Sequence, residues 1–135
     1  MSNLEAFLHP VQAQETKEII ISNRFQQNGK PVPFVIRALS EEESRKIRES
    51  CTRKTRNRAG GVSSEFNADA FSVKMLIAGT VTPDFNSTEL CSAYGTMDPM
   101  EVPGRMLLAG EYGKLSDAIA ELSGFDDDIE EQAKN

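Results

Sequence analysis

Two runs rich in strand-forming residues flank an Asn-Gly pair, and this arrangement constrains the fold more than any other feature of the chain. The runs cover 17–25 and 31–39, and Asn28-Gly29 between them is the strongest short-range signal for a β-hairpin with a two-residue loop. That loop places Ile21 opposite Ile36. Seven of the eight side chains on this face are apolar, in the pairs Phe25–Val32, Asn23–Phe34, Ile21–Ile36 and Ile19–Ala38. A slip of one residue would turn one strand's set to the other face, so the turn and the pattern agree on the register.

Two prolines near the turn predict that the second strand, 32–38, lies at an edge of the sheet. Pro31 and Pro33 fall at positions of the hairpin where the missing N–H would have pointed away from the first strand. A lone hairpin is marginally stable in water, so helices must cover its apolar face. We therefore expect an α+β domain in which an N-terminal antiparallel hairpin packs against a helical C-terminal part.

The C-terminal part contains about four helical segments, each with its own boundary signals. A helix from Ser40 begins with the capping box Ser40-Glu41-Glu42-Glu43 and buries little. The segment 66–81 is the most apolar, and we expect it to be the buried helix. A short helix starts within 86–89 and stops at Gly95, and Asp98-Pro99 starts another that restarts near Gly104. The last helix, 111–123, carries a stripe of Tyr112, Leu115, Ile119 and Leu122, which we interpret as core, with a docking surface as the open alternative. Gly124 ends it with a left-handed cap.

Charge is unevenly distributed along a chain with a net charge of −6. Residues 45–58 carry seven Lys or Arg and one Glu, and 53–65 is rich in Gly, Ser and Arg, so we expect a flexible basic loop there. The last ten residues, 126–135, carry five acids and one lysine, and we expect a disordered acidic tail after a single domain of 1–125. A short helical turn is expected around Leu4–Leu8, before Pro10.

Residue patterns for catalysis or for metal and cofactor binding are absent from this sequence. His9 is the single histidine, and Cys51 and Cys91 have no CxxC spacing, so we expect reduced thiols, no enzyme, no cofactor and no small-molecule substrate. No run approaches the length of a membrane span, and no secretory signal opens the chain, which predicts a cytoplasmic protein without a membrane partner. The basic side chains of Arg53, Lys54, Arg56 and Arg58 leave one alternative open, contact with nucleic acid. The acidic net charge and the lack of interleaved aromatic residues argue against it.

Several distinctive pieces give the chain a family resemblance over residues 1–125. They are Ser50-Cys51-Thr52, the segment 90–95, Met106-Leu107-Leu108 and Gly110-Glu111-Tyr112, although Ala109 stands where the family commonly has a proline. With these pieces the chain resembles the XkdN-like tail assembly chaperones of phages and prophages of Gram-positive bacteria.

The resemblance implies a non-structural assembly factor that coats the tape measure protein in many copies, keeps it soluble, and is absent from the mature particle. For that partner we expect contacts from apolar side chains of the C-terminal helices, namely Met106, Leu107, Leu108, Tyr112 and Leu115. Self-association is a further interaction to be considered. The alternative is a small nucleic-acid-binding or regulatory protein that uses 53–58.

Overall fold

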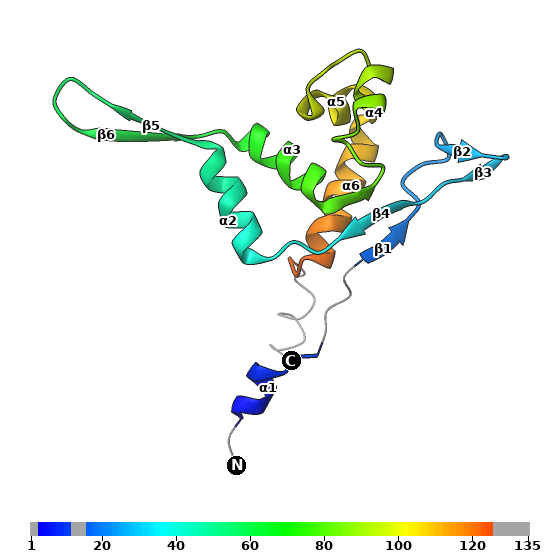
Figure 1. Ribbon diagram of the computed structural model, residues 1–135, viewed down its shortest axis with the longest axis horizontal. Helices are drawn as coiled ribbons and strands as arrows, with labels where there is room; N and C mark the ends of the chain where they lie inside the picture. Colours follow the sequence, from blue (N-terminus) through cyan, green and yellow to red (C-terminus); the bar gives the residue numbers. More distant parts are fainter. Residues whose placement is uncertain (1–2, 12–15, 126–135) are drawn as a thin grey trace.

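The computed structural model describes residues 3–11 and 16–125, and it is an α+β fold as predicted, with strands in the N-terminal half and helices in the C-terminal part (Figure 1). The predicted acidic tail, 126–135, lies outside the described residues. The elements in chain order are α1 (Leu4–Leu8), β1 (Thr16–Ile19), β2 (Gln26–Gln27), β3 (Lys30–Pro31), β4 (Phe34–Arg37), α2 (Glu41–Ser50), β5 (Thr52–Arg56), β6 (Val62–Phe66), α3 (Ala68–Gly79), β7 (Thr80–Thr82), α4 (Thr88–Ala93), the 3-10 turn η1 (Pro99–Glu101), α5 (Val102–Met106) and α6 (Ala109–Leu122).

The main sheet has three antiparallel strands in the order β1-β4-β7, so β4 is the central strand. The prediction that 32–38 forms an edge strand is therefore wrong for β4. On the side away from β1, Val35 pairs with Thr82 and Ile36 with Thr80. Pro31 and Pro33 come before Phe34, where β4 begins, so their missing N–H groups constrain only the tip of the hairpin.

The hairpin turns at the predicted place but changes register below its tip. Asn28 and Gly29 have φ values of 55° and 77°, as a type I′ turn requires, and Gln27 pairs with Lys30. Lower down, Ile19 pairs with Phe34 and Lys17 with Ile36, so the predicted pairing of Ile21 with Ile36 is wrong.

The offset arises because residues 20–24 leave the ladder between β1 and β2, whereas the Phe25 carbonyl still accepts the Val32 N–H of the predicted Phe25–Val32 pair. The offset is four residues, an even number, so Ile19, the apolar residue of β1, stays on the face that the sequence predicts. Ile21, although outside any strand, is buried in the same core cluster as Ile36.

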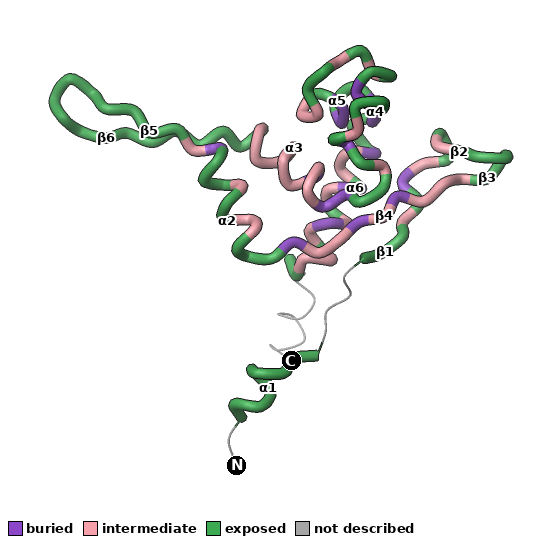
Figure 2. Tube along the Cα trace, in the orientation of Figure 1, coloured by how far each residue is buried: buried purple, intermediate pink, exposed green. Residues whose placement is uncertain are grey.

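The core lies where the sheet meets α3 and α6, as the buried stretches in Figure 2 show. Leu115 and Ile119 of the predicted α6 stripe are fully buried, while Tyr112 and Leu122 are half-buried at its ends. The expectation that the 66–81 helix is the buried one holds only in part, because Leu76 and Gly79 are the buried residues of α3. The largest fully buried side chains are Phe85, Ile36, Leu76, Leu115, Val102 and Pro103.

The basic segment expected to be a loop is a β-hairpin, β5–β6, that projects from the body (Figure 1). Thr52 pairs with Phe66 and Arg56 with Val62, so the five pairs span the whole of both strands. The Asn57 side chain organises the connection, since its Oδ1 accepts hydrogen bonds from two N–H groups of the loop that ends at Gly61. The Gly- and Ser-rich composition suggested a loop because it lacks apolar alternation, but local hydrogen bonds complete the ladder.

Most of the predicted helix boundaries are confirmed. Ser40 and Glu43 form the capping box of α2, Ser87 caps α4, and the Asp98 side chain accepts from the Met100 N–H at the start of η1. The restart after η1 comes at Val102, two residues before the predicted Gly104. Gly124 has a φ of 97° after α6, and the Phe125 N–H donates to the carbonyl of Ala120, the hydrogen bond of a left-handed helix cap.

Candidate functional site

The five apolar residues singled out from the sequence divide between core and surface. Met106, Leu107 and Leu115 are 8%, 8% and 0% exposed and belong to the core. Leu108 is 60% exposed at the start of α6, and Tyr112, one turn later, is half-buried. Leu108 and Tyr112 are therefore the two that a partner can reach without unfolding the domain.

Tyr112 lies at an open surface formed by α3, η1, α5 and α6. Its hydroxyl hydrogen-bonds to the Ser72 hydroxyl at 2.9 Å, which joins α6 to α3. A shallow pocket of about 630 Å³ opens beside it, with Val73 and Met100 as its main apolar lining. Asp69, Glu101 and Arg105 provide charged groups at its rim, so an apolar patch with a mixed-charge border lies here.

A buried carboxylate at the start of α6 was not predicted from the sequence. Glu111 is 8% exposed, and Arg24 donates to both of its oxygens, through Nε at 2.9 Å and Nη2 at 2.5 Å. The Leu108 N–H donates to Glu111 Oε1 at 2.7 Å, and Arg24 Nη2 also reaches the Met106 carbonyl. These bonds lower the pKa of Glu111 to about 2, and the hydrogen bond from Arg24 is the largest cause. The same bonds tie residues 20–25 to the α5–α6 junction.

The two roles of Glu111, as a helix cap and as the partner of Arg24, differ in whether the sequence could have predicted them. Glu111 stands at the third position of α6, where a glutamate commonly caps a helix start, so its cap could have been anticipated from the sequence. Its partner Arg24 lies 87 positions earlier, and no local signal joins the two residues.

A second ion pair holds the far end of the sheet. Arg37, at the end of β4, pairs with Glu43 in the first turn of α2 and donates from Nε to the Ala78 carbonyl of α3 at 2.9 Å. The Arg37 hydrogen bond lowers the pKa of Glu43 to about 2, with help from the backbone N–H and hydroxyl of Ser40. One guanidinium thus fastens a strand and two helices together.

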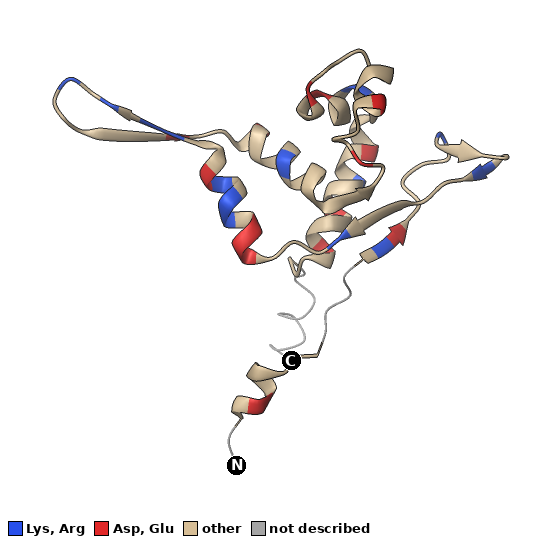
Figure 3. Cartoon of the chain, in the orientation of Figure 1, with Lys and Arg blue, Asp and Glu red and all other residues tan. Residues whose placement is uncertain are grey.

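The basic residues named from the sequence lie on the projecting hairpin, as Figure 3 shows. Arg53, Lys54 and Arg56 belong to β5, Arg58 lies in the turn, and all four are exposed. Arg53 stands opposite Glu65, whereas Lys54 and Arg56 share the other face with exposed Val62. The hairpin therefore presents a few cations with apolar and hydroxyl side chains, rather than a continuous basic surface.

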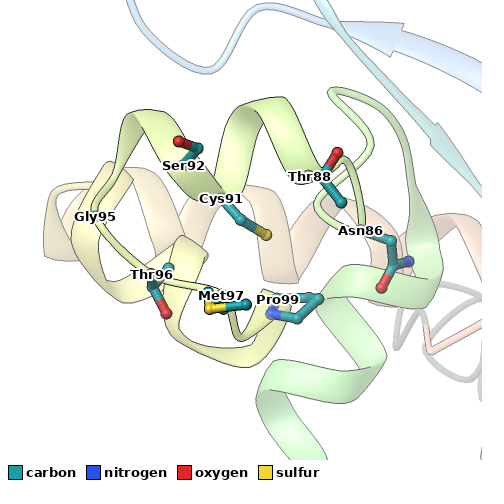
Figure 4. Close-up of a pocket in the computed structure, with 8 residues that line it drawn as sticks. All are labelled: Asn86, Thr88, Cys91, Ser92, Gly95, Thr96, Met97 and Pro99. Carbon is teal, nitrogen blue, oxygen red and sulfur yellow. The ribbon is translucent and has the colours of Figure 1, made fainter.

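The distinctive segment 90–95 lines a pocket of about 540 Å³ between α4 and the start of η1 (Figure 4). The Cys91 thiol points into it and donates to the Phe85 carbonyl at 3.6 Å, and Met97 and Pro99 lie across from it. The other lining groups are the uncharged side chains of Asn86, Thr88, Ser92 and Thr96, with Gly95. The side chains of this lining carry no formal charge at neutral pH apart from what the Cys91 thiol could develop, so the pocket is suited to holding an uncharged group.

A third opening, about 310 Å³ in volume, separates α2 from α3 and α6. Exposed Arg48 of α2 is the charged residue of its lining, and the apolar lining residues are Phe71, Met75, Leu76, Ile119, Ala120 and Phe125. The Arg48 guanidinium lies 5.3 Å from the centre of the Phe71 ring, a cation–π distance.

Across the described ranges, no helix combines the length and apolar composition that a membrane crossing requires. In the same residues, no three His, Cys, Asp or Glu side chains gather into a possible metal site. Cys51 and Cys91 are both buried and unpaired.

Comparison with known proteins agrees with the resemblance seen in the sequence. The family model described as phage XkdN-like tail assembly chaperone protein matches residues 4–135, and so extends through the acidic tail. A Bacillus subtilis (strain 168) protein named uncharacterized protein YqbN is 35% identical over 137 residues, which cover 96% of this chain and 92% of YqbN. Phage-like element PBSX protein XkdN of the same organism is 33% identical over 130 residues, which cover 93% of this chain and 87% of XkdN.

A solved structure agrees with the fold as well. The crystal structure of YqbN superimposes with a TM-score of 0.70 and 30% sequence identity, covering 90% of this chain and 96% of the other. Since the family model spans nearly the whole chain and both relatives match over most of their own length, this chain belongs to the phage XkdN-like tail assembly chaperone family.

Proposed function

We propose that this protein binds a tape measure protein in the cytoplasm of the bacterial host, keeps it soluble, and is absent from the mature particle. Membership of the tail assembly chaperone family is the observation that carries the proposal. The protein acts by binding alone in this proposal and performs no catalytic step.

The physical reason for such a chaperone is the apolar surface of a long amphipathic helix. A helix of this kind exposes more apolar area than a soluble protein tolerates, so it aggregates unless it is covered. A cover that must later be removed should bind each stretch weakly, and many weak contacts along one chain sum through multivalency. The net charge of −6 would keep a coated complex dispersed.

The surface beside Tyr112 is the best candidate for this contact. A groove that receives a helix needs apolar side chains spaced to meet positions on one helical face, with polar groups at the border. Leu108 and Tyr112 lie one turn apart on α6, and Val73 and Met100 line the adjoining pocket. Asp69 in this lining could pair with a cation on the partner helix, whereas Glu101 and Arg105 already pair with each other.

Co-expression with the tape measure protein of the same phage or prophage tests the proposal. The soluble fraction of the tape measure protein should rise with this chain present, and a complex should elute together. Leu108→Asp should lose most of this effect, because a charge would enter an exposed apolar contact while the backbone N–H of residue 108 still caps α6. Met97→Asp is the matched control, since Met97 is 97% exposed at the separate pocket of Figure 4.

An equal soluble fraction with and without this chain, together with no co-eluting complex, would refute the proposal. Salt-dependent DNA binding that is lost when Arg53, Lys54, Arg56 and Arg58 are changed to alanine would then favour the nucleic-acid alternative. Mass spectrometry of purified particles tests the second part, because a chaperone should be absent from them.

A further inference from the structure

The projecting hairpin has two strand edges that no third strand covers within the described residues. β5 and β6 form a two-stranded sheet of their own, and every residue of β6 is exposed. Figures 1 and 2 show the hairpin standing out from the body and exposed along most of its length. A two-stranded hairpin alone is marginally stable in water, and a free strand edge is a template for a further strand.

The hydrogen-bond pattern of the hairpin shows which backbone groups of β6 point outward. Next to the turn, the Asn57 N–H donates to the Gly61 carbonyl at 2.9 Å, and at the base the Asn67 N–H donates to the Cys51 carbonyl at 2.9 Å. Both bonds fit the unbroken register of β5 and β6, and bonded pairs alternate along an antiparallel ladder. The odd-numbered residues of β6 therefore bond to β5, and the even-numbered residues direct their N–H and C=O groups away from it.

The even-numbered residues also carry the apolar side chains of β6. They are Val62, Ser64 and Phe66, whose side chains share one face because alternate residues of a strand do so. Val62 is 64% exposed, and Phe66 is 48% exposed although its ring centre lies 5.5 Å from that of Phe71 in α3. The outer edge of β6 thus offers free hydrogen-bonding groups and two apolar side chains, spaced symmetrically about Ser64.

This edge is complementary to itself. When two copies of β6 run antiparallel with Ser64 opposite Ser64, the outward N–H and C=O groups of the two strands meet around a two-fold axis. Val62 of each copy then lies opposite Phe66 of the other, an aromatic and β-branched pair of the kind that stabilises antiparallel sheets. On the other face Glu65 lies opposite Ser63, whose hydroxyl can donate to the carboxylate, so no like charges stand opposite one another.

The outer edge of β5 lacks this complementarity. Lys54 is its central outward residue, since it pairs with Ser64 across the hairpin, and Arg56 is the next outward residue. Two β5 edges paired in the same way would place Lys54 opposite Lys54, and like charges directly opposite destabilise a sheet. The β6 edge is therefore the one that can pair with its own copy.

Charge complementarity also favours a second copy as the partner. Residues 52–66 carry four Lys or Arg and one Glu, a net charge of +3 in a chain of net charge −6, so the rest of the sequence carries −9. Antiparallel pairing brings the turn of one copy, with Arg58, to the hairpin base of the other. The charged residues that line the opening at this base are Arg53, Glu65 and Asp69, and Asp69 makes no salt bridge within the described residues. A cation from the second copy can therefore meet an acid there.

We propose that two copies of this chain join through their β6 edges, with Ser64 on the two-fold axis, into a four-stranded antiparallel sheet of order β5-β6-β6-β5. This contact goes beyond the function proposed above and does not depend on the tape measure protein, because neither Leu108 nor Tyr112 takes part in it. The pairing covers the free edge of β6 and removes Val62 and Phe66 from water together.

Opposite charges at position 64 test the proposal, because this residue meets its own copy only at a two-fold axis. Sedimentation velocity of the full chain should show that the wild type associates more as its concentration rises. Ser64→Lys alone and Ser64→Glu alone each place like charges opposite one another, so each should associate about three- to tenfold more weakly. An equal mixture of the two variants should restore association as a one-to-one complex, because an ammonium and a carboxylate then lie opposite one another.

A pair of proline variants compares the two edges of the hairpin. Ser64→Pro removes the outward N–H donor at the centre of β6 and keeps the N–H groups that bond to β5, so association should weaken about tenfold or more. Lys54→Pro removes the equivalent outward N–H at the centre of β5 and is the matched control, which should associate like the wild type. Melting temperatures of both variants check that the domain remains folded.

The proposal is overturned if the wild-type protein stays monomeric at every concentration, as it would if the β6 edge receives an extended segment of another protein instead. It is also overturned if the mixture of Ser64→Lys and Ser64→Glu associates no more strongly than either variant alone. Equal weakening by Lys54→Pro and Ser64→Pro would overturn the assignment to β6 as well.

Discussion

Gly79→Ala tests how closely α3 and α6 must approach to form the core. Gly79 is buried at the end of α3, and a Cβ at this position would lie 2.5 Å from Cγ2 and 3.0 Å from Cδ1 of Ile119. Carbon atoms pack best at about 3.5–4.0 Å, so the new methyl group would overlap by about 1 Å or more. Ile119 is 3% exposed, and its side chain would have to shift to make room for the new methyl group.

The expected net effect is a loss of stability. Overpacking of a core costs about 1–3 kcal/mol. Replacing a helical glycine by alanine returns at most about 1 kcal/mol, and less at a terminal helical position such as this one. We therefore expect Gly79→Ala to lower the free energy of unfolding by about 1–2 kcal/mol, and the urea midpoint by about 0.5–1 M at an unchanged slope.

Two further variants isolate the cause. Gly113→Ala, in the interior of α6 with no atom within 4 Å of the added Cβ, should raise stability by about 0.5–1 kcal/mol. Ile119→Ala should cost about 2–5 kcal/mol in the wild type and clearly less in the Gly79→Ala background, because the two changes share one contact. Far-UV circular dichroism during urea unfolding measures the wild type, the three single variants and the double variant. A Gly79→Ala protein as stable as the wild type, or additive effects in the double variant, would refute the reasoning.

The remaining predictions concern the ion pair of α6, the hairpin turn and the tail. The pKa of Glu111 falls from 4.5 to about 2 on folding, so its pairing with Arg24 contributes stability above about pH 4.5 and loses it as the pH falls toward 2. Melting temperatures between pH 2 and 6 should show this decline, and Glu111→Gln should be less stable at pH 6 and less dependent on pH. Gly29→Val should destabilise the domain by on the order of 1 kcal/mol in urea unfolding, because Gly29 has a φ of 77°, and an unchanged midpoint would contradict this. Deletion of 126–135 should leave thermal stability nearly unchanged, and a loss above about 1 kcal/mol would show that the domain extends past residue 125.

Features that depend on residues a few positions apart were readable from the sequence. The Asn28–Gly29 turn, the Ser40–Glu43 capping box and the left-handed Gly124 lie where the local patterns predict them. Each involves backbone groups within about five residues, so a short stretch of sequence contains every atom that decides it. The family assignment also came from short motifs, since 90–95 and 110–112 remain recognisable without knowledge of their surroundings.

Features that join distant residues were decided only in the tertiary structure. Arg24 pairs with Glu111 across 87 positions, and it does so from the segment that leaves the ladder where the register of β1 shifts. The addition of β7 made β4 central, although Pro31 and Pro33 before it suggested an edge. Of the residues expected at the partner surface, Leu115 proved to be core and Leu108 surface, because an apolar helix position is buried or exposed according to what packs against it. A local pattern specifies the torsion angles and caps of a segment. Which other segments lie beside that segment in space depends on the packing of the whole chain.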